Sequence, residues 1–323
     1  MIPGRLFEPA QRGYLGRGRH ILSAMPELPD IRLYVTRLNE RVAGATLESI
    51  VLGSPFVLRT VTPRPADVAG KRVLQVSRLG KRLVFELEEE LFVMIHLMIA
   101  GRLQWVTPAP EPKRPHGKIQ LAILRFSSGQ LTLVEHSTKK RAAISLLRGR
   151  AALEAERRAG LDPTSISPER FVEQLVSERR TLKRALTDPS WFDGIGNAYS
   201  DEILFAAKLS PMRLTSSLSE EEALRLASTT REVLEYWTVR LQELYPGFPK
   251  QGDVTAFRPD FTVHGRFKER CRVCGAPVQH IVYVDKETNY CAICQNEGRL
   301  LADRSLSRLL KDDWPKMLVS EGD

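Results

Sequence analysis

The sequence lacks a long hydrophobic run, and it has no cysteine outside one short segment. The longest strongly apolar stretch, LFVMIHLMIAG at 91–101, is about half the length that a bilayer-crossing helix needs, and it contains a histidine. No secretory segment is evident, and no cysteine precedes Cys271. These absences argue against a membrane-spanning protein and against a secreted disulfide scaffold. We therefore expect a soluble globular protein, and 323 residues with 42% hydrophobic content suffice for two or three packed units.

Acidic residues are in deficit. The chain carries 48 Lys and Arg against 39 Asp and Glu, which gives a formal net charge of +9. A basic excess favours polyanionic partners, because each neutralised phosphate releases condensed counterions. Many basic proteins carry only solvated charge, however, so composition alone leaves nucleic-acid binding open.

The four cysteines have the spacing of a metal site. Cys271, Cys274, Cys291 and Cys294 form two C-x2-C pairs that are sixteen residues apart. Two such pairs on tight turns can bring four thiolates to one tetrahedral Zn²⁺, and the gap between them suits a hairpin. We predict one structural Zn²⁺ here, with a redox dithiol or a disulfide framework as the alternative.

Residues 1–24 differ in character from the rest of the chain. They hold four arginines, four glycines and two prolines, without apolar periodicity. This composition predicts a disordered extension, or a mis-assigned start whose true first residue is Met25. An organelle presequence is the weaker alternative, because the glycines and prolines disfavour an amphipathic helix.

Residues 25–150 are predicted to form an antiparallel β-sandwich or barrel preceded by one helix. Apolar residues recur at helical spacing from Ile31 to Val42, with Pro29 suited to the first turn and Gly44 near the end. β-Branched and aliphatic runs follow, separated by glycine, proline or charged turns. These runs are TLESIVLG, RVLQVSRLG, KRLVFELEE, LFVMIHLMI, GRLQWVT, KIQLAILRF, QLTLVEHS and AAISLL.

Beyond residue 150 the apolar pattern becomes helical. The segments 167–188 and 219–244 carry capping residues and apolar stripes, and the turn GIGN at 194–197 leads directly into another predicted helix. We predict a helical domain over 151–250 and a zinc finger over 251–298, which includes a short strand at 261–271. The tail at 299–323 is predicted to form one amphipathic helix.

Four stretches, in order, resemble the formamidopyrimidine-DNA glycosylase and endonuclease VIII family. They are MPELPD at 25–30, GKRLVFEL followed by IHLMIAGRL, DGIGNAYSDEILFAAKLSP, and the four-cysteine hairpin. The resemblance implies an α+β multidomain fold with an N-terminal antiparallel β-sandwich and flanking helices, a helix-two-turn-helix domain and a C-terminal zinc-finger β-hairpin. It also implies a monomer that acts on damaged double-stranded DNA, in the cytoplasm and associated with the nucleoid.

The resemblance also assigns the covalent chemistry. A proline inside a chain is a tertiary amide, whereas an N-terminal proline is a nucleophilic secondary amine. Removal of Met25 would therefore make Pro26 the nucleophile that attacks C1′ of the damaged nucleotide, with strand cleavage following by β- and δ-elimination. Glu27 resembles the family's acid/base, and Lys81 resembles the lysine that contacts a phosphate near the lesion and assists catalysis.

Further residues are expected to bind DNA. Asn197 resembles the asparagine that grips a backbone phosphate. Asp30 occupies a position where the family usually has the longer Glu. Lys286 occupies a position where the family commonly has Arg, and the lysine keeps the positive charge but loses the bidentate hydrogen-bonding geometry of a guanidinium. Other residues expected to bind DNA are His96, Arg102 and Lys183.

The sequence departs from the family pattern at the lesion-binding segments. The usual HLGMSGR is HLMIAGR here, so Ile99 takes the place of the methionine wedge. The segment His136–Ile144 lacks the phenylalanine of the usual DPRRFG. From GDVTAFRPDF at 252–261 the chain also passes almost directly into TVHGRFKERC at 262–271, the predicted strand before the cysteines, without the longer loop that closes over a flipped purine. We therefore expect oxidised pyrimidines to be preferred over 8-oxoguanine.

The resemblance predicts a base-excision-repair DNA glycosylase with AP lyase activity. A catalytically inactive DNA-binding module of the same fold is the alternative, and it would follow if Met1 were the true start, because Pro26 would stay acylated. A zinc-ribbon RNA-binding protein is a third and weaker interpretation, since the adjacent proline and glutamate have no role there.

Overall fold

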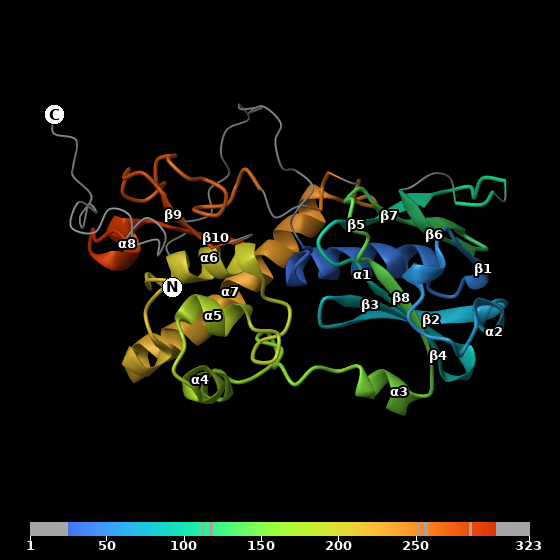
Figure 1. Cartoon of the computed structure of the whole chain (residues 1–323), viewed down its shortest axis with the longest axis horizontal. Coiled ribbons are helices and arrows are strands. Elements are labelled where there is room, and N and C mark those ends of the chain that lie inside the picture. The colour runs from blue at the N-terminus through green and yellow to red at the C-terminus, as the bar shows by residue number, and fades with distance from the viewer. Residues whose placement is uncertain are drawn as a thin grey trace. The chain divides into compact units, whose positions relative to one another are not determined.

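A computed structural model shows two compact units, the sheet unit and the helical unit (Figure 1). The sheet unit contains the described residues from 25 to 158 together with 236–254, and the helical unit contains 159–235 together with the described residues from 258 onward. The structure describes residues 25–111, 113–115, 119–250, 252–254, 258–283 and 286–301. The predicted extension at 1–24 and most of the predicted tail helix lie outside this range. Within it, no helix is long and apolar enough to cross a membrane.

The first predicted helix is confirmed as α1, Leu28–Val42. Pro29 lies in its first turn, where a missing N–H costs nothing, and Arg41 lies in its last turn beside the carbonyl end of the helix dipole. Ile31 and Leu38 belong to the buried face, which packs on the core of the sheet unit. The MPELPD segment at 25–30 is therefore held at the N-terminus of a helix that is packed on the core.

The predicted antiparallel sandwich is also confirmed. Its strands follow the order β5-β7-β6-β1-β2-β3-β4-β8, and every pairing is antiparallel. β1 pairs with β2 only at Thr46 and Leu47, so two four-stranded layers meet at this short junction. The strands are β1 Thr46–Leu52, β2 Lys71–Leu79, β3 Arg82–Leu87, β4 Leu91–His96, β5 Gly101–Val106, β6 Gln120–Phe126, β7 Gly129–Glu135 and β8 Ala143–Arg148.

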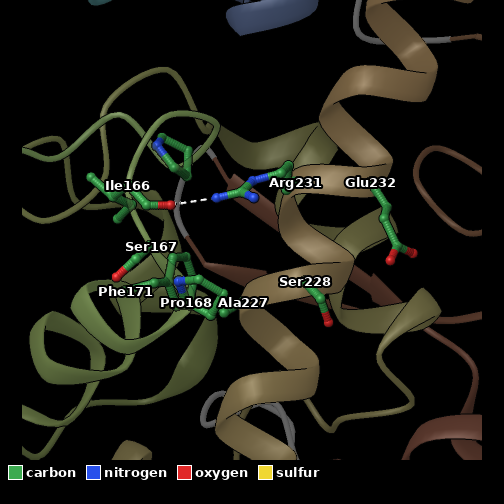
Figure 2. A pocket seen from close by; sticks show the side chains of 9 residues that line it. Ile166, Ser167, Pro168, Phe171, Ala227, Ser228, Arg231 and Glu232 are labelled. Atoms are coloured by element: carbon green, nitrogen blue, oxygen red, sulfur yellow. Dashed lines mark hydrogen bonds between the residues drawn. The ribbon is translucent and has the colours of Figure 1, made fainter.

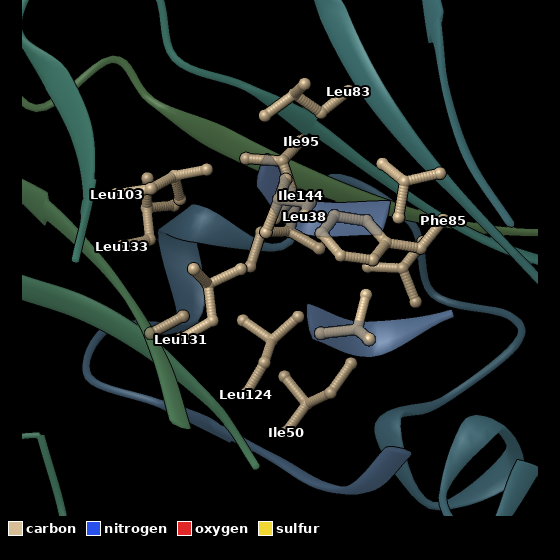
Figure 3. Packing of buried hydrophobic residues seen from close by; sticks show 14 of the residues in the cluster. Leu38, Ile50, Leu83, Phe85, Ile95, Leu103, Leu124, Leu131, Leu133 and Ile144 are labelled. Carbon is tan, nitrogen blue, oxygen red and sulfur yellow. The ribbon is translucent and has the colours of Figure 1, made fainter. Parts of the chain in front are cut away.

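Side chains from both layers converge in one core (Figure 3). Leu124 and Leu131 come from one layer, and Phe85 and Ile144 come from the other. All four are at most 1% exposed, and burial on this scale is what stabilises two packed sheets. Short elements decorate the unit: 3₁₀ turns Pro55–Val57 and Glu88–Glu90, α2 Pro65–Val68 and α3 Arg150–Ala155.

The helical unit contains the remaining elements. Its helix α7 is shared, because residues up to Glu235 belong to the helical unit and those from Tyr236 belong to the sheet unit. The elements are α4 Pro168–Val176, α5 Leu182–Thr187, α6 Asn197–Ala206, a 3₁₀ turn Thr215–Ser217, α7 Glu220–Leu244, β9 Gln279–Tyr283, β10 Lys286–Tyr290 and α8 Ala292–Asn296.

The helical pattern at 167–188 is divided between α4 and α5, because the backbone around Thr181 bonds to the segment 213–215. Leu182 N–H donates to the Arg213 carbonyl, and Thr215 N–H donates to the Arg180 carbonyl, both at 2.8 Å.

The predicted strand at 261–271 consists of turns. The buried carboxylate of Glu202 accepts the backbone N–H groups of Thr262, Val263 and His264 at 2.8, 2.9 and 2.9 Å. These donors are thereby unavailable to a neighbouring strand.

Candidate functional site

Pro26 and Glu27 lie immediately before the first turn of α1, and both are buried. Glu27 is the N-cap residue of this helix, and its backbone N–H donates a hydrogen bond to the Asp30 carboxylate at 2.9 Å. Glu27 is 2% exposed and Asp30 is 1% exposed. The helix end therefore fixes the residue that follows the predicted nucleophile. Asp30 accepts the hydrogen bond of this cap, and the DNA-binding role expected of it stays a prediction.

Lys81 and His96 lie in an electropositive corner of the sheet unit. Lys81 lies in the tight turn between β2 and β3, and His96 ends β4 directly opposite Arg82. Burial and, after it, the positive charges of Arg82, Arg158 and Lys81 together lower the pKa of His96 to about 4. His96 is therefore neutral at physiological pH. The positive potential that would attract a phosphate comes from the lysine and the arginines.

A tight turn follows His96. Met98 adopts a φ of 54°, a left-handed conformation that few residues other than glycine adopt. The N–H of Gly101 donates to the Leu97 carbonyl at 2.9 Å and closes the turn. A Cβ at position 101 would stand 2.3 Å from that carbonyl oxygen, so only glycine fits there. The predicted strand 91–99 therefore ends three residues early.

The side chain of Arg102 supports this turn from inside. It is 1% exposed, and its guanidinium donates to the carbonyls of Ile99 at 3.1 Å, Gly101 at 2.7 Å and Val254 at 2.8 Å. A guanidinium committed to backbone oxygens is not presented to DNA. We therefore correct the DNA contact predicted for Arg102 to a positioning role, in which it holds the partly exposed Ile99.

In the helical unit, Asn197 is the first residue of α6 and follows the predicted glycine-rich turn. Its side-chain amide donates to the Glu287 carbonyl on β10 at 2.8 Å. Lys183, on α5, is 8% exposed and donates to the Asn197 carbonyl at 2.6 Å and to the Asp201 carboxylate at 2.5 Å. The direct DNA contact predicted for Lys183 is corrected accordingly, because its ammonium group is buried and ion-paired.

Asp201 is a site residue that the sequence did not single out. One carboxylate oxygen pairs with Lys183, and the other accepts His264 Nδ1 at 2.7 Å and Asn289 N–H at 3.0 Å. Burial by itself raises the pKa of Asp201, but the Lys183 charge and the His264 hydrogen bond outweigh it and leave the pKa below its usual range. The only local signal was the acidic pair in YSDE, a common feature of helices.

The cysteines converge as predicted. All four sulfur atoms lie within 4.8 Å of one another, with Cys271 3.9 Å from Cys294 and Cys274 3.4 Å from Cys291. Four thiolates at the usual Zn–S bond length stand about 3.8 Å apart around a tetrahedral ion, so the cluster fits a structural Zn²⁺. A hydrogen bond from Cys291 lowers the pKa of Cys271 to about 5, whereas burial raises that of Cys294 to about 12. Full ionisation of the cluster therefore requires a bound cation. The side chain of Lys286 lies outside the described residues.

A pocket of about 150 Å³ lies between α4 and α7 (Figure 2). Arg231 projects into it from α7 and donates to the Ile166 carbonyl. Ser167 and Phe171 line the opposite side. None of the predicted site residues lines this pocket, so pocket shape does not identify the candidate site.

Two family models match the chain. The model described as the formamidopyrimidine-DNA glycosylase N-terminal domain matches residues 25–144, and the one described as the formamidopyrimidine-DNA glycosylase H2TH domain matches residues 160–241. A formamidopyrimidine-DNA glycosylase of Thermus thermophilus is 34% identical over 281 residues, which cover 85% of this chain and 100% of that protein. One from Ureaplasma parvum is 28% identical over 279 residues, which cover 84% of this chain and 100% of that protein.

Solved structures of the Lactococcus lactis enzyme are also similar. A complex of that enzyme with a THF-DNA and an inhibitor has a TM-score of 0.73 and 26% identity, and the match covers 84% of this chain and 100% of the other. Complexes with N7-benzyl-Fapy-dG DNA and with oxidised-pyrimidine DNA match with the same score, identity and coverage.

Proposed function

The chain belongs to the formamidopyrimidine-DNA glycosylase family, and on that premise we propose that it is a base-excision DNA glycosylase and AP lyase whose substrate is damaged double-stranded DNA. The observation that carries this conclusion is the Pro26–Glu27 pair at the N-terminus of α1, one residue inside the start of the family match. We also propose that the protein works in the cytoplasm at the nucleoid.

In the proposed reaction, the secondary amine of Pro26 attacks C1′ of the damaged nucleotide. The new N–C1′ bond replaces the glycosidic bond, and the base leaves. Glu27 donates a proton to the ring oxygen as the sugar opens, which leaves an iminium ion linked to Pro26. Removal of a C2′ proton then expels the 3′ phosphate by β-elimination, and removal of a C4′ proton expels the 5′ phosphate by δ-elimination. Water then hydrolyses the iminium bond, which releases the sugar fragment and restores the amine of Pro26. The buried position of Glu27 suits a group that must hold and release protons away from bulk water.

The sheet unit also supplies phosphate and gap-filling groups. Lys81, beside the neutral His96, is proposed to contact the phosphate near the lesion. Ile99, on the turn held by Arg102, is proposed to fill the gap that the flipped nucleotide leaves. Asn197 is proposed to bind a backbone phosphate at the N-terminus of α6, where the helix dipole favours an anion.

Covalent trapping tests the function. A zinc-loaded protein whose first residue is Pro26 is incubated with an abasic-site duplex and sodium borohydride, beside the full chain and beside a Pro26→Gly variant of the shorter form. The form that begins at Pro26 should give a covalent adduct that denaturing electrophoresis resolves. The full chain should give none, because its Pro26 nitrogen is an amide, and Pro26→Gly should give at most a weak band. An adduct of equal yield in all three would refute the role of Pro26.

The lesion preference is a finer proposal. The short passage from GDVTAFRPDF into TVHGRFKERC, without the longer loop that closes over a flipped purine, supports a preference for oxidised pyrimidines over 8-oxoguanine. Excision of 5-hydroxyuracil, formamidopyrimidine and 8-oxoguanine should be compared in duplexes of matched sequence. The preference fails if 8-oxoguanine is excised fastest.

The inactive DNA-binding module is the second candidate, and the amide at Pro26 in the full chain favours it. Intact mass of the protein made from its native gene decides between the two. A mass that begins at Pro26 supports the enzyme, and a mass that retains the preceding residues supports the module.

A further inference from the structure

We propose that Asp201 is a positioning residue that ties the phosphate-binding Asn197 to the zinc hairpin, and that Lys183 serves this linkage instead of binding phosphate. This inference rests on the proposed function, since it concerns how the same protein holds DNA. It adds a coupling between two elements that would otherwise contact DNA independently.

The linkage is a closed ring of hydrogen bonds among five residues. Lys183 donates to the Asn197 carbonyl at 2.6 Å and to Asp201 Oδ1 at 2.5 Å. Asp201 Oδ2 accepts the backbone N–H of Asn289 at 3.0 Å, and the Asn289 amide donates to the Glu287 carboxylate at 3.2 Å. The Asn197 amide donates to the Glu287 carbonyl at 2.8 Å and closes the ring. The ring therefore joins α5 and α6 to β10, the strand that leads into Cys291.

Burial makes the ring rigid. Asp201 and Asn289 are each 1% exposed, and Lys183 is 8% exposed. Charges removed from water are tolerated only when they are paired and hydrogen-bonded, so breaking one link leaves its partner buried and unsatisfied. His264, 4% exposed, adds a bond to the same carboxylate from the segment before the cysteines. A shift of Asn197 against β10 would therefore disrupt several bonds together.

The ring also determines which donor of the Asn197 amide is available to a DNA phosphate. A side-chain amide has two N–H donors, and the bond to Glu287 uses one, which leaves the other for a phosphate oxygen. The charge of Lys183 is neutralised by Asp201 before DNA arrives. Lys183 should thus release no counterion on binding, although its loss should loosen Asn197.

Salt dependence separates positioning from direct contact. The full, zinc-loaded chain is titrated with a duplex that carries a tetrahydrofuran abasic analogue, at several salt concentrations. Lys183→Met should weaken binding by about tenfold, as expected for a lost charge-assisted bond, while the slope of log K against log salt stays that of the unmodified protein. Arg184→Met is the matched control, because it removes an exposed cation at the next position of α5.

A second variant tests the coupling. Asn289→Ala deletes the bond to Glu287 without changing charge, and it should also weaken binding at an unchanged slope. The double variant should bind only slightly more weakly than either single variant, because both break one ring. Zinc content and thermal midpoint confirm that each variant is folded.

The proposal is overturned if Lys183→Met lowers the slope by about 0.9, the value for one phosphate contact. It is also overturned if Asn289→Ala binds like the unmodified protein, or if the two losses add fully; the Asn289→Ala result stands even where Lys183→Met fails to fold. Failure of the proposed function is a different result: the unmodified chain would then show no preference for the abasic duplex over undamaged DNA.

Discussion

Arg82 and His96 face each other as paired residues of β3 and β4, so a guanidinium stands beside an imidazole that burial already keeps neutral. In the unfolded chain the imidazole has its ordinary pKa of 6.5, and in the folded protein the pKa is about 4. The unfolded state therefore binds more protons between these two values, and the free energy of unfolding falls as the pH is lowered through this window.

The first prediction concerns this window. Between pH 6.5 and 4 the unmodified protein should lose on the order of 3 kcal/mol of stability through His96. His96→Gln should not show this loss, because glutamine has no proton to gain. Denaturant unfolding of both proteins at intervals across the window measures the difference. Parallel curves for the two proteins would show that His96 titrates normally in the folded state.

The second prediction concerns the cap of α1. Asp30→Ala removes the acceptor for the Glu27 N–H and should cost about 1 kcal/mol of stability. It should also slow borohydride trapping by the form that begins at Pro26, since Glu27 loses its anchor. Glu40→Ala, an exposed change on the same helix, is the control and should leave the trapping rate intact. Equal trapping rates for the two variants would contradict the anchoring role.

The third prediction contrasts two positions of one turn. Met98→Gly relieves a left-handed conformation that costs roughly 1–2 kcal/mol, and the added flexibility of glycine offsets part of this, so stability should rise by up to about 1 kcal/mol. Gly101→Ala places a Cβ against the Leu97 carbonyl and should destabilise by about 1–3 kcal/mol. Thermal unfolding of both variants measures this. Changes of the same sign would argue against the turn geometry.

The fourth prediction concerns the metal. A strong chelator should remove Zn²⁺ from the four cysteines, unfold the hairpin and reduce DNA binding, because metal binding and folding of such a cluster are linked. Added Zn²⁺ should restore binding and Mg²⁺ should not, since thiolates prefer the softer ion. Binding that survives complete loss of zinc would show that the hairpin is dispensable for affinity.

Local patterns in the sequence were sufficient for much of the fold. β-Branched and aliphatic runs separated by glycine, proline or charged turns predicted the strands from β1 to β8, and the C-x2-C spacing predicted the cysteine cluster. The end of β4 was missed because Met98 adopts a conformation that its residue type disfavours. The turns at 261–271 were missed because Glu202, about sixty residues earlier, takes up their backbone donors.

Prediction of the site residues from the sequence fails for the same reason, because their partners are distant along the chain. Lys183 and Arg102 are cations in stretches that resemble DNA-binding motifs, and sequence alone assigns such residues to phosphates. Their partners, Asp201 and Val254, lie 18 and 152 residues away, so only the fold reveals that both charges point inward. Asp201 and His264 are 63 residues apart and form no sequence motif together.

The sheet unit is built from two separate stretches of chain, and this limits how the protein can be recombined. Arg37 donates to the carbonyls of Gln242 at 2.8 Å and Tyr245 at 3.0 Å, and Arg102 donates to that of Val254. A fragment that stops at residue 158 would leave both guanidinium groups without these acceptors. A chimaera that takes residues 25–158 from a relative must therefore also take residues 236–254 from that relative. The unit that can be exchanged consists of two chain segments, with residues of the helical unit between them.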